Sequence, residues 1–212
     1  MTMREMTGPT PRTSVEAPKA GAARSMALRR RLAALLLAWF GQLGVMAGAA
    51  ADRPALPEFT HSAAGDWLNA MPLRATQLRG HPVLVEFWTF GCSNCLASMD
   101  WMRSTAARYR SLGLTVIGVH TPELPGEYQH SAVRAAVSRL GIDYPVMIDD
   151  DYSYWRALGN RYWPAFYIFD AEGHWVATAI GELHRGEPRS DAFEQALVQA
   201  LRSSARELAT PK

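Results

Sequence analysis

The chain has 212 residues, of which 48% are hydrophobic and only two are cysteines. The apolar share excludes an intrinsically disordered chain, and the low cysteine count excludes a small scaffold held by disulfides. The formal net charge is +2, but residues 1–31 hold seven of the 22 basic side chains and two of the 20 acidic ones, and residues 32–51 hold no charge. Residues 52–212 therefore carry 15 basic and 18 acidic groups. We expect no nucleic-acid partner.

The N-terminal segment has the three parts of a secretory signal peptide. Arg29 to Arg31 form a basic cluster, Leu32 to Phe40 form an apolar core, and Ala49 to Ala51 offer small residues for cleavage. Residues 1–25 precede Met26 and are interpreted as an over-extended gene start or a dispensable leader.

The competing interpretation of residues 1–51 is an N-terminal membrane anchor, with a tether through residues 28–51. The uncharged stretch from Leu32 to Ala51 has about the length that spans a bilayer core, roughly 20 residues. Under both interpretations the rest of the chain is exported. We expect it to be periplasmic or extracytoplasmic, either free after cleavage or anchored in the inner membrane.

Beyond a Pro- and Ala-rich linker predicted at 52–65, apolar periodicity predicts one domain over residues 66–206, with a C-terminal tail at 207–212. Strands are expected at 83–88, 114–119, 144–148, 165–169 and 174–180, and helices at 92–112, 129–140, after Asp149 to Asp151 up to Gly159, and around 193–201. Alternating strands and helices predict an α/β fold with a sheet between helical layers. The strand at 83–88 is apolar on both faces except for Glu86, which indicates a central position in the sheet.

The two cysteines lie close together in the segment Cys92-Ser93-Asn94-Cys95, after the buried strand and at the start of a predicted helix. Free backbone N–H groups at a helix N-terminus stabilise a thiolate, which is the attacking species in disulfide exchange. We expect Cys92, at the exposed helix start, to attack a substrate disulfide, and Cys95 to resolve the mixed disulfide. A static disulfide is the alternative, although a two-residue loop constrains the unfolded chain least. We predict no metal and no cofactor, because zinc needs about four ligands and no second Cys or His pair is available.

Glu86 and Pro164 are the other informative positions. A carboxylate among apolar neighbours is costly to bury as an anion, so we expect Glu86 to exchange protons near neutral pH and to serve Cys95. A hydrogen-bonded carboxylate without a role is the alternative. Trp163-Pro164 precedes a predicted strand, where proline is tolerated. Trp88 and Trp163 are the tryptophans that we place near the site, and we expect both to bind substrate together with Pro164. His120, Thr121 and Glu123 either shape a substrate groove or are ordinary loop residues.

With these residues placed, the sequence resembles the thioredoxin superfamily, and more narrowly its exported redoxin or TlpA-like branch, which includes the thioredoxin-like domain of DipZ-type proteins. The matching segments are Phe87 to Cys95, Thr115 to Glu123 and Tyr162 to Ala165, and the resemblance covers residues 66–202. It implies a thioredoxin-like fold with a central mixed β-sheet flanked by helices. Residues 121–148 resemble an inserted helix-strand unit.

The resemblance also implies a mechanism. It makes Cys92 and Cys95 a redox-active disulfide, and it places Glu86 at the family's buried acidic position. It predicts that Pro164 is cis and packs against the disulfide, while the backbone of Trp163 pairs with bound substrate. The expected function is reduction of disulfides in exported proteins, of the cytochrome c maturation type, with re-reduction by a membrane thiol electron donor of the DsbD/CcdA type.

Two alternatives stay open. Thr89-x-x-Cys92 matches part of a peroxiredoxin signature, but Val85 stands where that signature has proline. A copper-handling module would use both cysteines and a histidine. Asn94 stands where many thioredoxin-like proteins place proline, so the direction of electron flow is left open.

Overall fold

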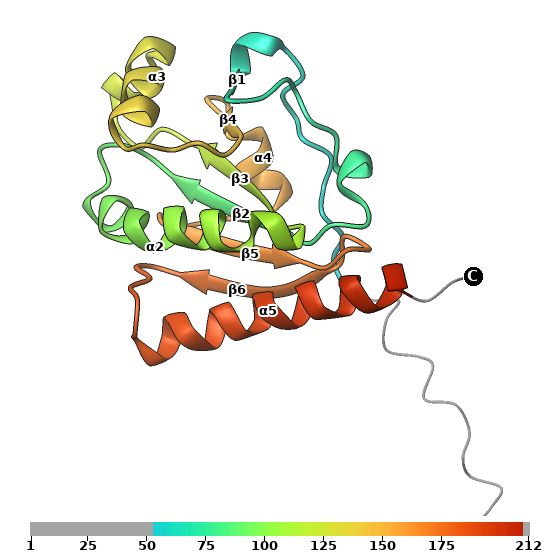
Figure 1. The fold of residues 1–212 in the computed structure, drawn as a ribbon. Coiled ribbons are helices and arrows are strands. Elements are labelled where there is room, and N and C mark those ends of the chain that lie inside the picture. The colour runs from blue at the N-terminus through green and yellow to red at the C-terminus, as the bar shows by residue number, and fades with distance from the viewer. Residues whose placement is uncertain (1–52, 210–212) are drawn as a thin grey trace, which may run out of the picture. The chain divides into compact units, whose positions relative to one another are not determined.

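A six-stranded mixed sheet forms the centre of the computed structural model, which describes residues 53–209 (Figure 1). The strands are β1 (Trp67–Leu68), β2 (Val83–Trp88), β3 (Thr115–His120), β4 (Val146–Ile148), β5 (Ala165–Phe169) and β6 (Trp175–Ile180). Their order is β1-β4-β3-β2-β5-β6. Strand β3 runs parallel to both β2 and β4, whereas β1, β5 and β6 are antiparallel to their neighbours. The predicted mixed sheet is confirmed, with β2 at a central position.

The helices are α2 (Ser93–Tyr109), α3 (His130–Arg139), α4 (Ser153–Ala157) and α5 (Pro188–Ala209), with 3-10 turns η2 (Ala64–Asp66), η3 (Ala75–Leu78), η4 (Arg110–Leu112) and η5 (Pro125–Tyr128). Helix α2 ends in a 3-10 turn before Gly113, whose φ of 93° is left-handed and costs glycine little. Helix α5 is much longer than the predicted 193–201. It starts at Pro188, because proline fits the first helical turn, and it extends into the predicted tail.

The side chains of β2 divide between two hydrophobic clusters, one on each face of the sheet. Leu84 and Trp88 join the cluster that includes side chains of α2 and α5, and Glu86 alternates with them toward that face. Val85 belongs to the opposite cluster, together with Tyr154 of α4. In Figure 1 α2 crosses in front of β2 and β5, while α4 lies behind. The residue order of β2 therefore directs Glu86 toward the helix that begins between the two cysteines.

Part of the predicted linker at 52–65 packs onto the domain. Leu56 and Phe59 are buried in the second cluster. Ala55 forms an antiparallel bridge with His174, and the backbone N–H of Leu56 donates to the carbonyl of Gly173 at 2.7 Å. Composition alone did not reveal this packing, since the segment contributes isolated apolar residues rather than a periodic run.

Within residues 53–209, no helix is both long and apolar enough to cross a membrane. The predicted leader, signal peptide or anchor of residues 1–51 lies outside the described residues.

Candidate active site

Cys92 is the N-cap of α2, at the point where the chain leaves β2 and enters the helix. Its sulfur accepts a hydrogen bond from the backbone N–H of Cys95 at 3.2 Å. The Cys92 sulfur thus satisfies one of the backbone N–H groups that have no partner within the first turn of the helix. Both cysteines are free thiols in this structure. The expected nucleophile geometry is present, with one correction: Cys92 is only 9% exposed, not openly exposed.

A groove of about 350 Å³ limits access to Cys92. The residues lining it are Gly91, Cys92, Ser93, Asn94, Glu123, Leu124 and Trp163. One wall is the turn between β2 and α2, and the opposite wall combines the loop after β3 with Trp163. The remaining access to the Cys92 sulfur therefore lies within a cleft formed by three separate parts of the chain.

Cys95 lies behind Cys92 and has no solvent exposure. Burial raises the pKa of the Cys95 thiol far above its ordinary value, and a hydrogen bond with Cys92 and the charge of Glu86 raise it further. Cys95 therefore stays protonated until a base removes its proton, as a buried resolving cysteine requires.

Glu86 is that nearby titratable group. It is fully buried, and burial raises its pKa to about 8 although a hydrogen bond from Tyr144 opposes the shift. The Tyr144 hydroxyl donates to Oε2 of Glu86 at 3.0 Å, whereas Oε1 has no partner among the described residues. The carboxyl group thus has one fixed oxygen and one free oxygen in a dry interior.

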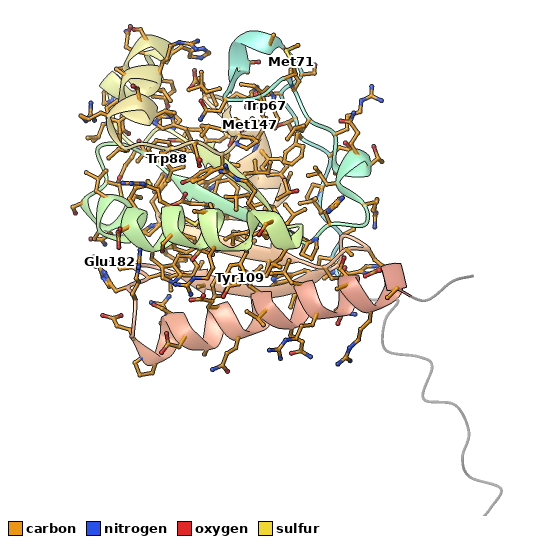
Figure 2. The ribbon with its side chains drawn as sticks, in the orientation of Figure 1. Trp67, Met71, Trp88, Tyr109, Met147 and Glu182 are labelled. Atoms are coloured by element: carbon orange, nitrogen blue, oxygen red, sulfur yellow. The ribbon has the colours of Figure 1, made fainter. Side chains whose placement is uncertain are left out.

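The two predicted tryptophans occupy different positions. Trp163 is half-buried and lines the groove, and its indole N–H donates to the carbonyl of Thr121 at 3.0 Å. Trp88 is completely buried and does not line the groove, which corrects the expectation that it contacts substrate. Figure 2 shows Trp88 within the packed interior. Its strand position directs it into the core beneath the site.

The Trp163–Pro164 peptide bond is cis, as the family resemblance predicts, and Pro164 is buried. The Pro164 carbonyl accepts a hydrogen bond from Gly181 at 2.8 Å, so this residue is fixed by the neighbouring strand. The indole of Trp163 packs on Trp155, with ring centroids 4.2 Å apart. These contacts hold Trp163 at the edge of the groove.

Of the three candidate residues at the end of β3 and in the loop after it, only Glu123 reaches the groove. His120 and Thr121 are completely buried. Burial lowers the pKa of His120 to about 4, so its imidazole is neutral at physiological pH. The ring stacks on Phe90, with centroids 5.5 Å apart, and serves the interior of the site.

Sequence reasoning missed Glu127, which is buried next to the groove. Its carboxylate accepts hydrogen bonds from the backbone N–H groups of Gly91 at 2.6 Å, Glu123 at 2.6 Å and Leu124 at 2.8 Å. A single glutamate in a Pro- and Gly-containing loop gives no periodic signal. Its place two residues after Pro125, at a 3-10 turn, was the only hint.

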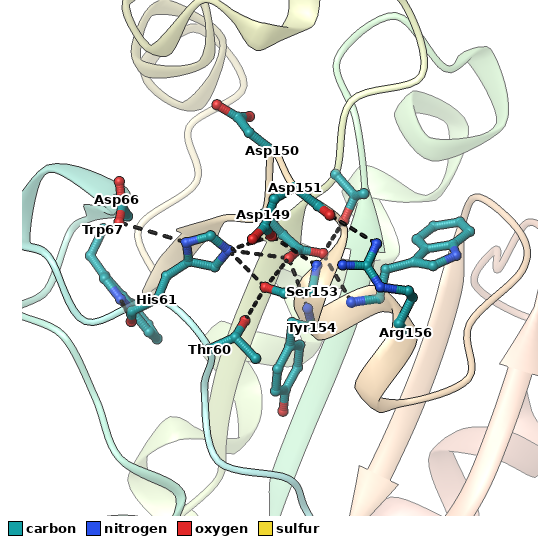
Figure 3. Close-up of polar contacts among 12 residues, drawn as sticks. Thr60, His61, Asp66, Trp67, Asp149, Asp150, Asp151, Ser153, Tyr154 and Arg156 are labelled. Carbon is teal, nitrogen blue, oxygen red and sulfur yellow. Dashed lines mark hydrogen bonds and ion pairs between the residues drawn. The ribbon is translucent and has the colours of Figure 1, made fainter.

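A second polar cluster joins residues 60 and 61 to the N-terminus of α4 (Figure 3). Nε2 of His61 lies 3.3 Å from Oδ1 of Asp149 and 3.2 Å from Oδ1 of Asp151. Oδ2 of Asp149 accepts from the Thr121 hydroxyl at 3.1 Å. His61, Asp149 and Asp151 could geometrically hold a cation, as could Asp170, Glu172 and His174. Hydrogen bonds within the chain account for the first cluster.

The Redoxin family model matches residues 50–197, more than half of the chain. This chain belongs to the Redoxin family. The protein DipZ of Mycobacterium bovis is 41% identical over 110 residues, which are 50% of this chain and 16% of that protein. The thiol-disulfide oxidoreductase YkuV of Bacillus subtilis is 29% identical over 121 residues, 57% of this chain and 80% of that protein.

Solved structures agree on the fold of this Redoxin-family protein. A thioredoxin-like protein determined in its oxidized form is 26% identical with a TM-score of 0.60, and the match covers 71% of this chain and 97% of the other. A secreted disulfide oxidoreductase of Mycobacterium tuberculosis is 21% identical with a TM-score of 0.50, covering 61% of this chain and 90% of the other. The predicted redoxin family and thioredoxin-like fold are confirmed, and the relative YkuV is named as a thiol-disulfide oxidoreductase. The chain spans only 16% of the length of DipZ.

Proposed function

We propose that this protein is an exported thiol-disulfide oxidoreductase that reduces disulfides of extracytoplasmic proteins, including those of the cytochrome c maturation type. The observation that carries the proposal is the pair of free thiols at the start of α2, with Cys92 capping the helix in a groove and Cys95 sealed behind it. One sulfur meets the substrate, and the other can react only with the first.

The reaction takes two exchange steps. The Cys92 thiolate attacks one sulfur of the substrate disulfide, forms a mixed disulfide and releases the other substrate sulfur as a thiolate. Cys95 then loses its proton and attacks the Cys92 sulfur, which releases the second substrate thiolate. The substrate gains two electrons, and the enzyme retains a Cys92–Cys95 disulfide.

Glu86 is the proposed acceptor of the Cys95 proton. Its charge already affects the Cys95 thiol, and burial raises its pKa to about 8, so protonated and ionised forms exchange near neutral pH. The free oxygen Oε1 is the one available for this exchange, either directly or through water. Resolution of the mixed disulfide therefore speeds up as pH rises toward 8.

The location and the electron donor are part of the same proposal. The signal-like segment of residues 1–51 supports export, and one structural neighbour is described as secreted. Each turnover leaves an oxidised cysteine pair that needs two electrons. We assign their delivery to a membrane thiol donor of the DsbD/CcdA type, with residues 28–51 as a tether if they are retained.

Insulin reduction by the full chain tests the activity. We expect turnover with the wild type and none with Cys92→Ser. Incubation of Cys95→Ala with insulin should accumulate a mixed disulfide at Cys92, visible on a non-reducing gel, whereas Cys92→Ala should trap none. A wild-type protein that only consumes hydrogen peroxide, or only binds copper, would instead support the peroxidase or the copper-handling alternative.

Direction of electron flow is tested by the reduction potential of the cysteine pair. A reductase should have a potential near that of thioredoxin, about −270 mV, whereas a value near about −120 mV marks an oxidant. Equilibration with glutathione buffers and thiol labelling measures it.

A further inference from the structure

We propose that Glu127 is a positioning residue for the groove, whose carboxylate holds the two walls at the separation that seats a disulfide-bearing polypeptide beside Cys92. The inference rests on the proposed function and adds to it the residue that determines substrate fit.

The two carboxylate oxygens bind opposite walls. Oε1 accepts the N–H of Gly91, the residue immediately before Cys92, at 2.6 Å. Oε2 accepts the N–H groups of Glu123 and Leu124, at 2.6 and 2.8 Å. All three donors belong to residues that line the groove. A single side chain that is 1% exposed therefore bridges the turn that presents the nucleophile and the loop that faces it.

Gly91 is matched to this arrangement. A Cβ atom added there would overlap Oε1 of Glu127, a contact that real structures do not tolerate. Only glycine lets the backbone N–H reach the carboxylate without displacing it. The two residues therefore specify each other across the groove.

A fourth contact, from Thr89 directly after β2, joins the carboxylate to the sheet. The Thr89 side chain hydrogen-bonds to Glu127, and its Oγ1 lies 3.2 Å from Nε2 of His120. Because a carboxylate only accepts hydrogen bonds, the Thr89 hydroxyl is the donor to Glu127. Burial opposes ionisation of Glu127, but the hydroxyl and backbone donors outweigh it and hold the pKa below its usual value. The anchor is thus an anion fixed to the ends of β2 and β3.

Glu127 lies outside the hydrophobic core of the domain, so its role in the groove can be tested separately from core packing. It lies on η5, a four-residue 3-10 turn. Neither hydrophobic cluster of the described domain includes a residue between 121 and 132. Loss of the carboxylate should therefore change the spacing of the groove walls while the clusters on both faces of the sheet stay packed.

The test compares two substrates in the full chain. Insulin presents its disulfides on polypeptide, whereas hydroxyethyl disulfide is small, neutral and needs only the Cys92 sulfur. A glutamine at position 127 keeps the volume but places an NH₂ group against one wall's N–H donors. For Glu127→Gln we expect kcat/KM with insulin to fall about tenfold, mainly through KM, since one or two charge-assisted hydrogen bonds are lost. With hydroxyethyl disulfide we expect a change of less than about twofold by the same reasoning.

The same substitution at Glu187, which is exposed and does not line the groove, is the matched control. Gly91→Ala provides a second route, because it displaces the carboxylate from the opposite wall and should reproduce the insulin-specific loss. It also decides the question if Glu127→Gln does not fold.

Equal losses on both substrates, or wild-type kinetics in either variant, would overturn the positioning role while leaving the proposed function intact. A wild-type protein that reduces neither substrate would overturn both. An insulin-specific rise in KM in both variants, with the thermal midpoint close to that of the wild type, supports the inference.

Discussion

Glu86 and Cys95 are two acids buried in the interior of the domain, and both have a raised pKa. Burial is the dominant cause for both, and the charge of Glu86 adds to the raised pKa of the cysteine. Among the described residues, Tyr144 supplies the one hydrogen bond to the Glu86 carboxyl group. At neutral pH the resting state therefore holds both protons, and the chemistry of resolution requires one of them to leave. Oε1 of Glu86, which has no hydrogen-bond partner among the described residues, is the atom we propose for this proton exchange.

This pKa makes a prediction about stability. The pKa of Glu86 is about 8 in the folded protein, against an ordinary value of 4.5. Between these values the folded state holds a proton that the unfolded state has lost, so stability falls as pH rises, by up to about 1.4 kcal/mol per pH unit. Glu86→Gln should remove this slope and be more stable than the wild type at pH 8. Urea unfolding under reducing conditions from pH 5 to 8 measures it, with Glu187→Gln as control; identical slopes in all three proteins would contradict the prediction.

Tyr144→Phe gives a second prediction at this site. The Tyr144 hydroxyl lowers the pKa of Glu86, so its removal should raise that pKa further above its present value. The pH at which resolution of the mixed disulfide reaches half its maximal rate should then move upward, while Glu86→Gln loses the transition altogether. Stopped-flow tryptophan fluorescence across the alkaline range records the profile. An unchanged midpoint in Tyr144→Phe would show that Glu86 does not control the step.

Helices and strands could be predicted from the sequence where the run of apolar residues was long enough to show a period. The predicted strands 83–88 and 165–169 match β2 and β5 residue for residue. Strand β1 was missed because two residues cannot show an alternation, and α5 was underestimated because its first turn carries no apolar stripe. Pairing with β4 and packing against β6 define these elements, and neither contact is visible along the chain.

Some residues of the candidate site could likewise be predicted from the sequence, and others could not. Cys92, Cys95 and Glu86 were predicted because a C-x-x-C pair and a charged residue in an apolar strand stand out by themselves. Trp88 was expected to bind substrate, since the sequence does not reveal whether an aromatic residue near the motif faces the groove or the core. Glu127 was not predicted, since its role depends on three backbone N–H groups brought together only by folding.

The run of aspartates before α4 makes a testable prediction about an element. The Asp149 side chain caps the first turn of α4, accepting the N–H groups of Tyr154 and Trp155 at 2.9 Å each. Asp149→Asn should cost about 2 kcal/mol of unfolding free energy, because it leaves a buried donor against an NH₂ group. Asp100→Asn, the same change on a side chain that is 78% exposed, should cost less than about 0.5 kcal/mol. Urea unfolding at pH 7 compares them, and equal losses would show that the buried cap has no special role.

On the scale of the whole described domain, the site lies where the fold concentrates loop residues. The parallel strands β2 and β3 end at the same edge of the sheet. Cys92 follows the first of them and Glu123 follows the second. Open α/β sheets place their functional crevices at the carboxyl ends of such strands. The antiparallel β5 brings in Trp163 from its other end, since its first residue pairs beside the end of β2. Topology thus delivers three distant segments to one groove.

The last prediction concerns the segment before β1, which the sequence alone suggested was a linker. Phe59 is buried, and its ring lies 5.3 Å from that of Trp67 and 5.2 Å from that of Tyr154. Phe59→Ala in the full chain should therefore lower the free energy of unfolding by about 3 kcal/mol, because it empties a core position. Met71→Ala, at a residue that is 72% exposed, should change it by less than about 0.5 kcal/mol. Urea unfolding followed by tryptophan fluorescence measures both. A loss in Phe59→Ala as small as that in Met71→Ala would mean that this segment contributes nothing to the stability of the domain.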